Sequence, residues 1–555
     1  MINKKALIII PARGGSKGIP QKNLRFINGK PLIGYTIENA LSVENADIIV
    51  STDDKLIKEV AENYNVKVSL RNDKLSDDNA TIDDVVYDFI KNNKSNNSLY
   101  EKVITLQLTS PLLKKESLQK AILNYEIGTT LVSVTEEYKL IWIQKGDKFV
   151  QFHKERKNRQ ELSPFMLENG AFVISSISQI LKHKTRFGKD IRFNIISKEE
   201  AIDVDNFDDL NLVDAILKRR NIAIVISGSY STGLGHVYRG ITIGDRFSND
   251  NICYYTHKSQ DLAISKIQKY NRKLFVYKDE AELLELISNN NENIVINDFL
   301  DTSKEYIKAL KNNGHFVANF EDLGSGAYES HILINALYEF SANFEQNRFF
   351  GYKYECLRED MFLYPVKTKV KPKAQKVLIA FGGTDINNLT KKILDIITKS
   401  KVEVEINIIL GLGYKHLDEL KSQIATEKLE NVKIYQDILL ISKFINESDL
   451  VITANGRMVY EVVSSATPLL VISQNSREDM HLFPRMCSAI QYIGNYSQID
   501  EEELKKNLIE CINNKEKRTQ INNELIPFAY EIREGISKIQ NIINEKYKMF
   551  KLYDN

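Results

Sequence analysis

The sequence has few of the residues that mark special classes of protein. Its 555 residues include four cysteines and one tryptophan, and the cysteines lie far apart with no C-x-x-C pair. That spacing excludes a disulfide framework and a cysteine-rich zinc site, and it is typical of a reducing compartment, so we expect a cytoplasmic location. The opening apolar run is too short for a secretion signal and ends at Pro11. No stretch approaches the roughly 20 apolar residues of a membrane-spanning helix, so no membrane span is expected.

An excess of charge of either sign is also missing. The 75 lysines and arginines nearly balance the 74 aspartates and glutamates, and the formal net charge is +1. This balance argues against a large nonspecific surface for nucleic acid, so nucleic acid is not an expected partner. A chain of this length is sufficient for roughly two to four domains. The composition therefore indicates a multi-domain globular protein.

A glycine-rich loop follows the first apolar run, which spans residues 6–10 and predicts a buried strand. The loop carries three glycines and three cations: Gly14, Gly15, Gly18, Arg13, Lys17 and Lys22. Glycines let backbone N–H groups approach phosphate oxygens, and the cations offset the phosphate charge. The spacing fits neither the dinucleotide fingerprint G-x-G-x-x-G nor the Walker loop G-x-x-x-x-G-K-[ST]. The residues therefore predict a phosphate site of another kind.

Short β-branched runs alternate with helical patterns over the first part of the chain. The predicted strands are residues 6–10, 48–51, 66–70, 103–108, 130–134 and 171–174. This alternation predicts βαβ units and a mainly parallel sheet. Because ligands of such sheets bind beyond the carboxyl ends of the strands, we expect functional residues directly after these runs.

Two polar segments follow predicted strands. Residues 51–54, Ser-Thr-Asp-Asp, are interpreted as a helix N-cap. After the fourth strand, Gln107, Thr109 and Ser110 are placed to hydrogen-bond a base or a sugar. Capping of the next helix by Ser110 ahead of Pro111 is the competing interpretation, and the two are compatible.

A pair of aspartates lies near the end of this first region. On a strand, Asp203 and Asp205 project to the same face, where their charges repel unless a cation lies between them. Mg²⁺ or Mn²⁺, shared with nucleotide phosphates, fits such a pair, and plain solvated charge is the alternative. Asp208 and Asp209 are expected to start the following helix, where acidic residues complement the helix dipole.

These segments together resemble one known family. The string PARGGSKGIPQKN, the S-T-D-D segment, Q-x-T-S-P, an approximate R-x-Q…N-G-A segment and a closing D-x-D occur in the order seen in acylneuraminate (sialic acid) cytidylyltransferases. The resemblance covers about residues 1–215, and Leu108 stands where a proline is common. The related Kdo cytidylyltransferases begin with a different loop. The resemblance implies a Rossmann-like, glycosyltransferase-A-like domain over residues 1–220 that forms a homodimer or a higher homo-oligomer.

The resemblance also implies a role for each matched residue. CTP would be held by Arg13, Gly14, Gly15, Ser16, Lys22, Asn23, Arg71 and Ser110. A sialic acid-like sugar would be contacted by Gln107, Arg159, Gln160 and Asn169. The catalytic set would be Arg13, Lys22, Asp203 and Asp205, with Mg²⁺ on the two aspartates. The anomeric hydroxyl of a nine-carbon 2-keto acid would attack the α-phosphate of CTP and release pyrophosphate, which needs positioning and cationic stabilisation but no His or Cys nucleophile. The general base, and the choice among neuraminic, legionaminic and pseudaminic acids, stay open.

A second glycine-rich turn begins a new region after residue 220. A predicted strand over residues 222–226 leads into S-G-S-Y-S-T-G-L-G-H-V-Y-R, with His236 at the mouth of the turn. Glycine N–H groups at a helix N-terminus favour an anion, and a histidine there can act as a base near neutral pH. A histidine that only caps the turn is the alternative, and the residues leave the two open.

A basic, proline-containing stretch without periodicity, residues 367–376, predicts an interdomain linker. Further strands are predicted at residues 294–296, 316–319, 377–380, 406–410, 432–434, 450–453 and 469–472. Two similar α/β halves, residues 221–366 and 367–555, predict a two-lobed glycosyltransferase-B-like domain with its ligand in the cleft between them. The helical pattern of residues 528–550 is expected to pack back across that cleft.

The second half resembles the nucleotide-sugar hydrolases of pseudaminic acid biosynthesis, distant relatives of MurG-type glycosyltransferases. The resemblance rests on G-x-G-H-x-x-R, G-G-x-D and G-x-x-x-x-E and spans about residues 221–500. It implies His236 as a base or water-orienting group. A UDP-sugar site would be formed by Gly233, Gly235, His236, Gly382, Gly383 and Glu461. The usual serine-threonine after the late glycine is Arg457-Met458 here. Hydrolysis of a UDP-diacetamido-sugar, sugar transfer from the CMP-sugar and a noncatalytic binding scaffold therefore stay open.

Overall fold

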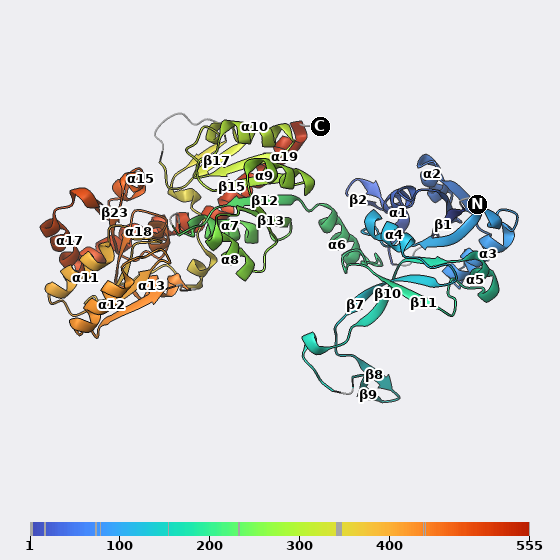
Figure 1. The fold of residues 1–555 in the computed structure, drawn as a ribbon, viewed down its shortest axis with the longest axis horizontal. Coiled ribbons are helices and arrows are strands. Elements are labelled where there is room, and N and C mark those ends of the chain that lie inside the picture. Colours follow the sequence, from blue (N-terminus) through green and yellow to red (C-terminus); the bar gives the residue numbers. More distant parts are fainter. Residues whose placement is uncertain are drawn as a thin grey trace. The chain divides into compact units, whose positions relative to one another are not determined.

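The protein divides into two compact units. The structure is a computed structural model that describes residues 4–15, 18–72, 75–77, 79–153, 155–230, 233–339, 347–436, 438 and 440–553. Internal contacts separate unit 1, Met1–Arg219, from unit 2, Arg220–Asn555 (Figure 1). Among the described helices, none combines the length and the apolar character that a membrane crossing requires.

Unit 1 contains a seven-stranded sheet in the order β11-β7-β10-β6-β1-β4-β5. The strands are β1 Lys5–Ala12, β4 Ala46–Thr52, β5 Lys67–Leu70, β6 Tyr100–Leu106, β7 Thr130–Glu137, β10 Phe165–Ser175 and β11 Ile191–Ile195. The main helices are α1 Leu32–Leu41, α2 Lys55–Asn63, α3 Ile82–Asn92, α4 Lys115–Leu123, α5 Ile177–His183 and α6 Phe207–Leu217. The six predicted strands are confirmed, whereas β11 was not predicted.

The alternating side chains of β1 explain why helices cover both faces of this sheet. Ile8 and Ile10 pack with residues of α1, α2 and α4, while Leu7 and Ile9 pack with residues of α3 and α5. All four side chains are at most 1% exposed. A strand buried on both faces is typical of a sheet built from βαβ units, and β1 accordingly pairs in parallel with β4 and β6.

One strand of unit 1 is antiparallel to its neighbours, in a sheet that is otherwise parallel. β10 is antiparallel to both β6 and β7, while the other four pairings of the sheet are parallel as predicted. Its pairing with β7 is interrupted between Glu168 and Val173, and Gly170 has a φ of 75°. Asn169 and Gly170 therefore lie inside the strand and not in a turn before it. The two residues form a bulge inside β10, where glycine adopts a backbone conformation that other residues disfavour.

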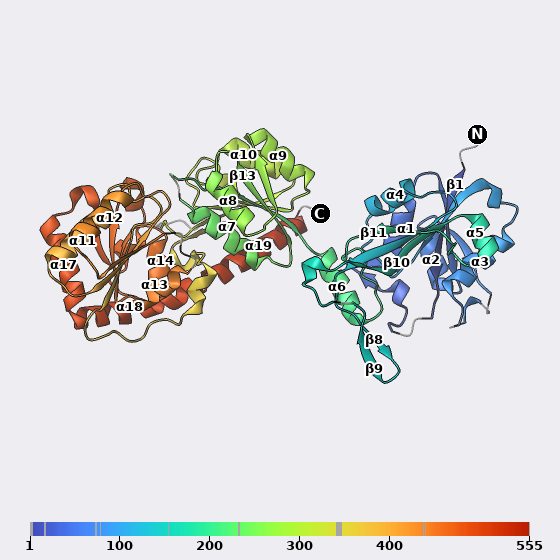
Figure 2. The same cartoon turned by 60° about the horizontal axis from the view of Figure 1, so that its bottom comes forward.

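A hairpin projects from the sheet of unit 1 (Figures 1 and 2). It consists of β8 Trp142–Lys145 and β9 Lys148–Gln151, which pair with each other in antiparallel fashion. Trp142 is 55% exposed and Phe149 is 69% exposed, so this arm presents apolar side chains to its surroundings. The sequence analysis did not predict it.

Unit 2 contains two parallel sheets, one in each predicted lobe. The first lobe has the order β14-β13-β12-β15-β16-β17-β18 and the second has the order β21-β20-β19-β22-β23-β24. The strands of the first lobe are β12 Asn221–Ile226, β13 Asn251–His257, β14 Leu274–Tyr277, β15 Ile294–Asp298, β16 Phe316–Phe320, β17 Ile332–Asn335 and β18 Arg348–Phe350. Those of the second lobe are β19 Lys376–Ala380, β20 Glu405–Leu410, β21 Val432–Gln436, β22 Leu450–Ala454, β23 Leu469–Ser473 and β24 Gln491–Asn495. The predicted two-lobed α/β architecture is confirmed.

Two segments cross between these lobes. Residues 365–375, which overlap the predicted linker of residues 367–376, form neither helix nor strand. At the other end of the unit, α18 Lys515–Arg533 packs into the core of the second lobe, and α19 Gly535–Tyr553 follows it. Ile536, Ile539 and Ile543 of α19 are buried in the core of the first lobe. The terminal helix therefore packs back across the lobes as predicted, although Pro527 lies inside α18 and the break comes at Glu534.

Candidate functional sites

The cationic loop of unit 1 meets the aspartate segment, which lies some 180 residues later in the chain. Lys22 Nζ donates a hydrogen bond to the carbonyl oxygen of Val204 at 2.7 Å and contacts Asp205 Oδ1 at 3.2 Å. A Cβ atom added at Gly18 would lie 2.3 Å from the carbonyl oxygen of Asp205, so the loop backbone rests directly against that segment. The close approach explains why glycine is needed at position 18.

The two aspartates lie in an irregular segment before α6, and the prediction of a strand there is wrong. Val204 between them is fully buried, whereas the side chain of Asp205 is 71% exposed. Burial raises the pKa of Asp203, a hydrogen bond from Thr109 opposes that shift, and the charge of Asp205 adds to it. Asp203 Oδ1 is buried without a hydrogen-bond partner. A buried carboxylate oxygen without a donor, next to a second carboxylate, suits a cation that takes oxygen ligands.

The described residues contain no group of three or more His, Cys, Asp or Glu side chains that could hold a metal ion. Asp203 and Asp205 could thus supply only part of a coordination shell, and a nucleotide would have to supply more. Asp209 does not join the pair, because its carboxylate accepts from the backbone N–H groups of Asp205 and Asn206 in the capping box of α6. This confirms that Asp208 and Asp209 form the first turn of the helix.

The start of the glycine loop is tied to the end of β4. The N–H of Gly14 donates to Asp53 Oδ1 at 2.8 Å, and a Cβ atom at Gly14 would lie 2.6 Å from Asp54 Oδ2. Asp54 caps α2 by accepting from two backbone N–H groups, which confirms the N-cap interpretation for this residue. Asn23 fixes the other side of the loop by donating to the carbonyl oxygen of Arg13 at 2.9 Å. Gly15 has open space around it, and Ser16 lies outside the described residues.

Arg71 adds a half-buried cation to the same edge of the sheet. Its guanidinium donates to Ser51 Oγ at 3.0 Å and to the carbonyl oxygen of Ser51 at 2.6 Å. Burial lowers the pKa of Arg71 to about 10, with the charge of Asp53 opposing this shift and that of Arg13 adding to it. Arg71 therefore stays charged at neutral pH and lies close enough to Arg13 to feel its charge.

The polar residues after β6 line up with the bulge in β10. A Cβ atom at Gly170 would lie 2.8 Å from Gln107 Nε2, so the Gln107 side chain packs on the glycine. Asn169 accepts a hydrogen bond from Ser133 at 2.7 Å, while its Nδ2 atom is buried without a partner. Ser110 Oγ is also buried without a partner. The alternative that Ser110 caps a helix is wrong, because α4 begins at Lys115.

Arg159 and Gln160 are not brought to this cluster. They lie in a short 3₁₀ helix, Arg159–Glu161, and both side chains are exposed. Within the described part of the chain, neither residue has a recorded hydrogen bond or ion pair with the loop or with the aspartates. Their predicted contact with a sugar has no support from their position in a single copy of the chain.

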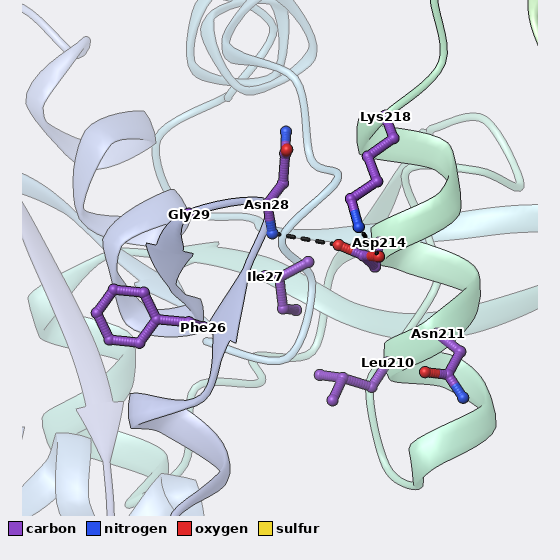
Figure 3. Close-up of a pocket in the computed structure, with 8 residues that line it drawn as sticks. All are labelled: Phe26, Ile27, Asn28, Gly29, Leu210, Asn211, Asp214 and Lys218. Carbon is purple, nitrogen blue, oxygen red and sulfur yellow. Dashed lines mark hydrogen bonds and ion pairs between the residues drawn. The ribbon is translucent and has the colours of Figure 1, made fainter. Parts of the chain in front are cut away.

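A separate pocket of 480 Å³ lies beside α6 (Figure 3). Part of its lining comes from the hairpin of β2 (Phe26–Ile27) and β3 (Lys30–Pro31), which contributes Phe26, Ile27, Asn28 and Gly29. The rest of the lining consists of Leu210, Asn211, Asp214 and Lys218. The carboxylate of Asp214 accepts from the Asn28 N–H at 3.2 Å and from Lys218 Nζ at 2.5 Å (Figure 3). None of the predicted site residues lines this pocket, and its carboxylate is already paired.

In unit 2, glycine turns from both lobes surround a cavity of 570 Å³. All six residues of the predicted second site line it: Gly233, Gly235, His236, Gly382, Gly383 and Glu461. A Cβ atom at Gly383 would lie 3.2 Å from the Cα atom of Gly233, so the two lobes meet here through backbone atoms. Burial raises the pKa of Glu461, and the charge of Arg358 opposes that shift.

His236 lies in the first turn of α7, Gly235–Arg246, but does not cap it. Its Nδ1 atom lies 2.6 Å from Asp298 Oδ1 at the end of β15. Arg239, one turn along α7, makes hydrogen-bonded ion pairs with both Asp298 and Glu321. The capping interpretation of His236 is therefore wrong. The sequence analysis assigned no role to Asp298 or Glu321, and it included Arg239 only as the last residue of the G-x-G-H-x-x-R motif.

Arg457 connects the second lobe to this network. Its Nη2 atom donates to Glu355 Oε1 at 2.6 Å, and its Nη1 atom lies 3.8 Å from Glu321 Oε1. Burial raises the pKa of Glu355 to about 7, with the charge of Arg457 opposing the shift. The departure from the expected serine-threonine thus places an arginine at the junction of the lobes, where it pairs with two buried carboxylates.

The cytidylyltransferase family model matches residues 7–140. A pseudaminic acid cytidylyltransferase of Campylobacter jejuni is 35% identical over 224 residues, which are 39% of this chain and 97% of that protein. A CMP-N,N'-diacetyllegionaminic acid synthase of Legionella pneumophila is 33% identical over 233 residues, 40% of this chain and all of that protein. Among solved structures, MurG of Acinetobacter baumannii has a TM-score of 0.43 and 14% identity over 58% of this chain and 99% of that chain. The last likeness is too weak to identify unit 2.

Other curated relatives extend beyond the matched region. The chain spans 62% of the length of an N-acylneuraminate cytidylyltransferase of Streptococcus agalactiae, at 30% identity over 258 residues. It spans 56% of a Methanocaldococcus jannaschii protein of unknown function. In contrast, the Campylobacter jejuni and Legionella pneumophila enzymes are matched over nearly their whole length. Through its first unit, the chain belongs to the cytidylyltransferase family.

Proposed function

We propose that unit 1 transfers CMP from CTP to the anomeric hydroxyl of a sialic acid-like nine-carbon 2-keto acid and releases pyrophosphate. The observation that carries this proposal is the contact of Lys22 with Val204 and Asp205, which joins the phosphate loop to the aspartate pair. The names of the relatives that the chain matches almost completely support the class of sugar. A choice among neuraminic, legionaminic and pseudaminic acids requires an assay.

The described residues can supply most of what an in-line displacement at phosphorus needs. Backbone N–H groups of the glycine loop and the charges of Arg13, Lys22 and Arg71 would stabilise the negative charge that gathers on the leaving pyrophosphate. Gln107, next to the bulge at Gly170, is placed to contact the acceptor sugar. The buried and unpartnered atoms of Ser110 and Asn169 are available for hydrogen bonds to substrate.

Asp203 and Asp205 would hold a Mg²⁺ or Mn²⁺ ion. The unpartnered Oδ1 atom of Asp203 and the exposed carboxylate of Asp205 support this assignment. When bound, such an ion neutralises phosphate charge and orients the nucleotide. Lys22 contacts Asp205 and so holds one of the two carboxylates in place.

The direct test measures pyrophosphate release from CTP with N-acetylneuraminic, legionaminic and pseudaminic acids, with and without Mg²⁺. We expect turnover with one of the three, and a loss of at least about 10²-fold in Asp205→Asn, the size typical of a lost electrostatic contact to the transition state. Asp214→Asn is the matched control, because Asp214 belongs to the same unit but lines the separate pocket of Figure 3. Absence of turnover with every sugar, both with and without Mg²⁺, would overturn the proposal.

For unit 2 we propose hydrolysis of a UDP-diacetamido-sugar in the cavity between the lobes. This proposal is supported by one cavity that is lined by both glycine turns, His236 and Glu461. UDP release from a UDP-diacetamido-trideoxyhexose should be lost in His236→Ala. Retained release would exclude His236 as the base. Binding without cleavage would favour the scaffold, and consumption of the CMP-sugar would favour a transferase.

We also propose that unit 1 self-associates through the β8–β9 arm and the neighbouring edge strand β11. Clustered exposed apolar side chains mark interaction surfaces, and Phe193 and Ile195 of β11 add to Trp142 and Phe149 of the arm. Light scattering should give the mass of a dimer or higher oligomer for the wild type and that of a monomer for Trp142→Lys combined with Phe149→Lys. Phe26→Lys is the control, because Phe26 is 72% exposed but lies outside the arm. A monomeric wild type would contradict the proposal.

A further inference from the structure

We infer that Asp298 is a positioning residue that fixes His236 with its proton on Nδ1, and so leaves Nε2 as the proton-accepting nitrogen of the second site. The inference deepens the hydrolase function proposed for unit 2 and rests on it. His236 lines the cavity, and its side chain is 11% exposed. Asp298 is fully buried behind it.

The distance between the two groups determines the tautomer. His236 Nδ1 and Asp298 Oδ1 lie 2.6 Å apart. A hydrogen bond accounts for this distance, whereas a lone pair on Nδ1 would repel the lone pairs of the carboxylate oxygen. A carboxylate has no proton to donate, so the hydrogen must be on Nδ1. In the neutral ring the other nitrogen, Nε2, then carries the free lone pair.

A second neighbour of Nδ1 does not change this result. Arg239 Nη2 lies 3.1 Å from His236 Nδ1, and it would donate to that nitrogen if Nδ1 were unprotonated. However, the same Nη2 atom donates to Asp298 Oδ1, while Arg239 Nε donates to Asp298 Oδ2 at 2.6 Å. The guanidinium therefore binds Asp298 through two parallel bonds, a geometry that fixes the carboxylate rather than the imidazole.

The surroundings of Asp298 keep it ionised. Burial by itself raises the pKa of Asp298, but the charges of Arg239 and His236 and their hydrogen bonds outweigh burial and hold the pKa below its ordinary value. Arg239 is shared with Glu321, so a buried arginine faces two buried carboxylates. Such a pairing offsets part of the cost of removing the charges from water, and breaking it would leave an uncompensated buried charge.

For attack of water at the anomeric carbon, the arrangement accounts for each proton and bond. A water oxygen forms a bond to the anomeric carbon of the sugar, and the bond from that carbon to the β-phosphate oxygen of UDP breaks with its electron pair on the phosphate. The water proton goes to Nε2 of His236. Asp298 takes no proton and stabilises the imidazolium that forms, as a carboxylate does in a Ser-His-Asp triad.

The first test is independent of substrate. In the full-length protein labelled with ¹⁵N-histidine, the ring resonances of His236, assigned by their loss in His236→Gln, should show hydrogen on Nδ1 in the neutral form. The Asp298→Asn variant should shift this population toward hydrogen on Nε2, because an amide can donate to Nδ1. Hydrogen on Nε2 in the wild type would overturn the inference, whatever the Asp298→Asn variant shows.

The second test is kinetic. If unit 2 hydrolyses a UDP-sugar, Asp298→Asn should lower kcat by about 10²–10⁴-fold with little change in KM, since positioned general-base catalysis contributes about that much. Asp322→Asn is the matched control, because Asp322 is also buried in this lobe but bonds to Thr302 and Asn319 and has no recorded contact with His236. An equal loss in both variants would indicate a structural role. If the wild type cleaves no UDP-sugar, the proposed function fails, while the tautomer measurement still decides the role of Asp298.

Discussion

The two candidate sites hold their carboxylates in opposite ways. In unit 1 the side chain of Asp205 is 71% exposed and Asp203 has an oxygen without a partner. In unit 2 Asp298 is fully buried and bound by Arg239 and His236. The first arrangement leaves a carboxylate oxygen of Asp203 open to a cation, whereas in the second both oxygens of Asp298 are already bonded. We therefore expect unit 1 to depend on added metal ion and unit 2 to be preorganised.

The strongest test of this comparison is to measure both activities on one set of variants. His236→Gln should lower UDP release by about 10²–10⁴-fold, the contribution typical of a positioned base. Asp203→Asn should lower CMP transfer by about 10²–10³-fold, the effect of removing one charge-stabilising group. Each variant should leave the other activity within twofold, or about 0.4 kcal/mol. A variant that lowers both activities would show that the sites are not independent.

A smaller effect is expected where the loop touches the aspartate segment. Gly18→Ala should weaken CMP transfer and lower the free energy of unfolding of unit 1 by about 1–3 kcal/mol, because its Cβ atom would overlap the carbonyl oxygen of Asp205. Gly15→Ala is the control, since nothing lies within 4 Å of the added atom. Thermal denaturation and the pyrophosphate assay check both variants. Equal effects at the two positions would mean that the loop does not rest on Asp205.

The buried carboxylates of unit 2 should make its stability depend on pH. The pKa of Glu355 is about 7 in the folded protein, raised by burial from an ordinary value of 4.5, so the folded state holds the proton more tightly than the unfolded state. Its contribution to stability is full below pH 4.5 and is lost as the pH rises through 7. Glu355→Gln should flatten the stability of unit 2 over that range, a difference on the order of 2 kcal/mol. Calorimetric melting curves from pH 5 to 8 measure it, and parallel curves would contradict it.

The smallest predicted effect concerns the cap that supports the loop of unit 1. Asp54→Ala removes the acceptor for the N–H groups of Leu56 and Ile57 at the start of α2. Loss of such a cap costs about 1 kcal/mol of stability. The melting temperature of unit 1 should fall, and that of unit 2 should not. A fall in unit 2 would show that the stabilities of the units are coupled.

The sequence was a good guide wherever a local pattern determines the structure. The apolar runs of β1 and β12 and the glycine turns that follow them were predicted because burial on both faces requires continuous β-branched residues. β11 was missed because its apolar residues alternate with polar ones and remain exposed, with Phe193 55% and Ile195 54% exposed. The direction of β10 depends on which strands lie beside it, and no local pattern determines that.

The same distinction applies to the sites. Lys22, Asp205 and His236 were predicted from short motifs in which the residue type itself suggests the chemistry. Asp298 was not predicted, because its pairing with His236 depends on β15 lying next to β12 in the sheet. Arg457 looked like a departure from a motif, and only the structure shows that it pairs with Glu355 of the other lobe.

The packing of α19 has a consequence for how the protein is made. The core of the first lobe is completed by Ile536, Ile539 and Ile543 of α19. The first strand of that lobe, β12, starts at Asn221, so more than 300 residues are synthesised between β12 and α19. During translation, the apolar residues of the first lobe that α19 covers stay exposed until α19 has been synthesised. This exposure delays the folding of the lobe and makes it prone to aggregation. In the described part of unit 1, the hydrophobic cores contain no residue beyond Leu217, so we expect this unit to finish folding while the rest of the chain is still being translated.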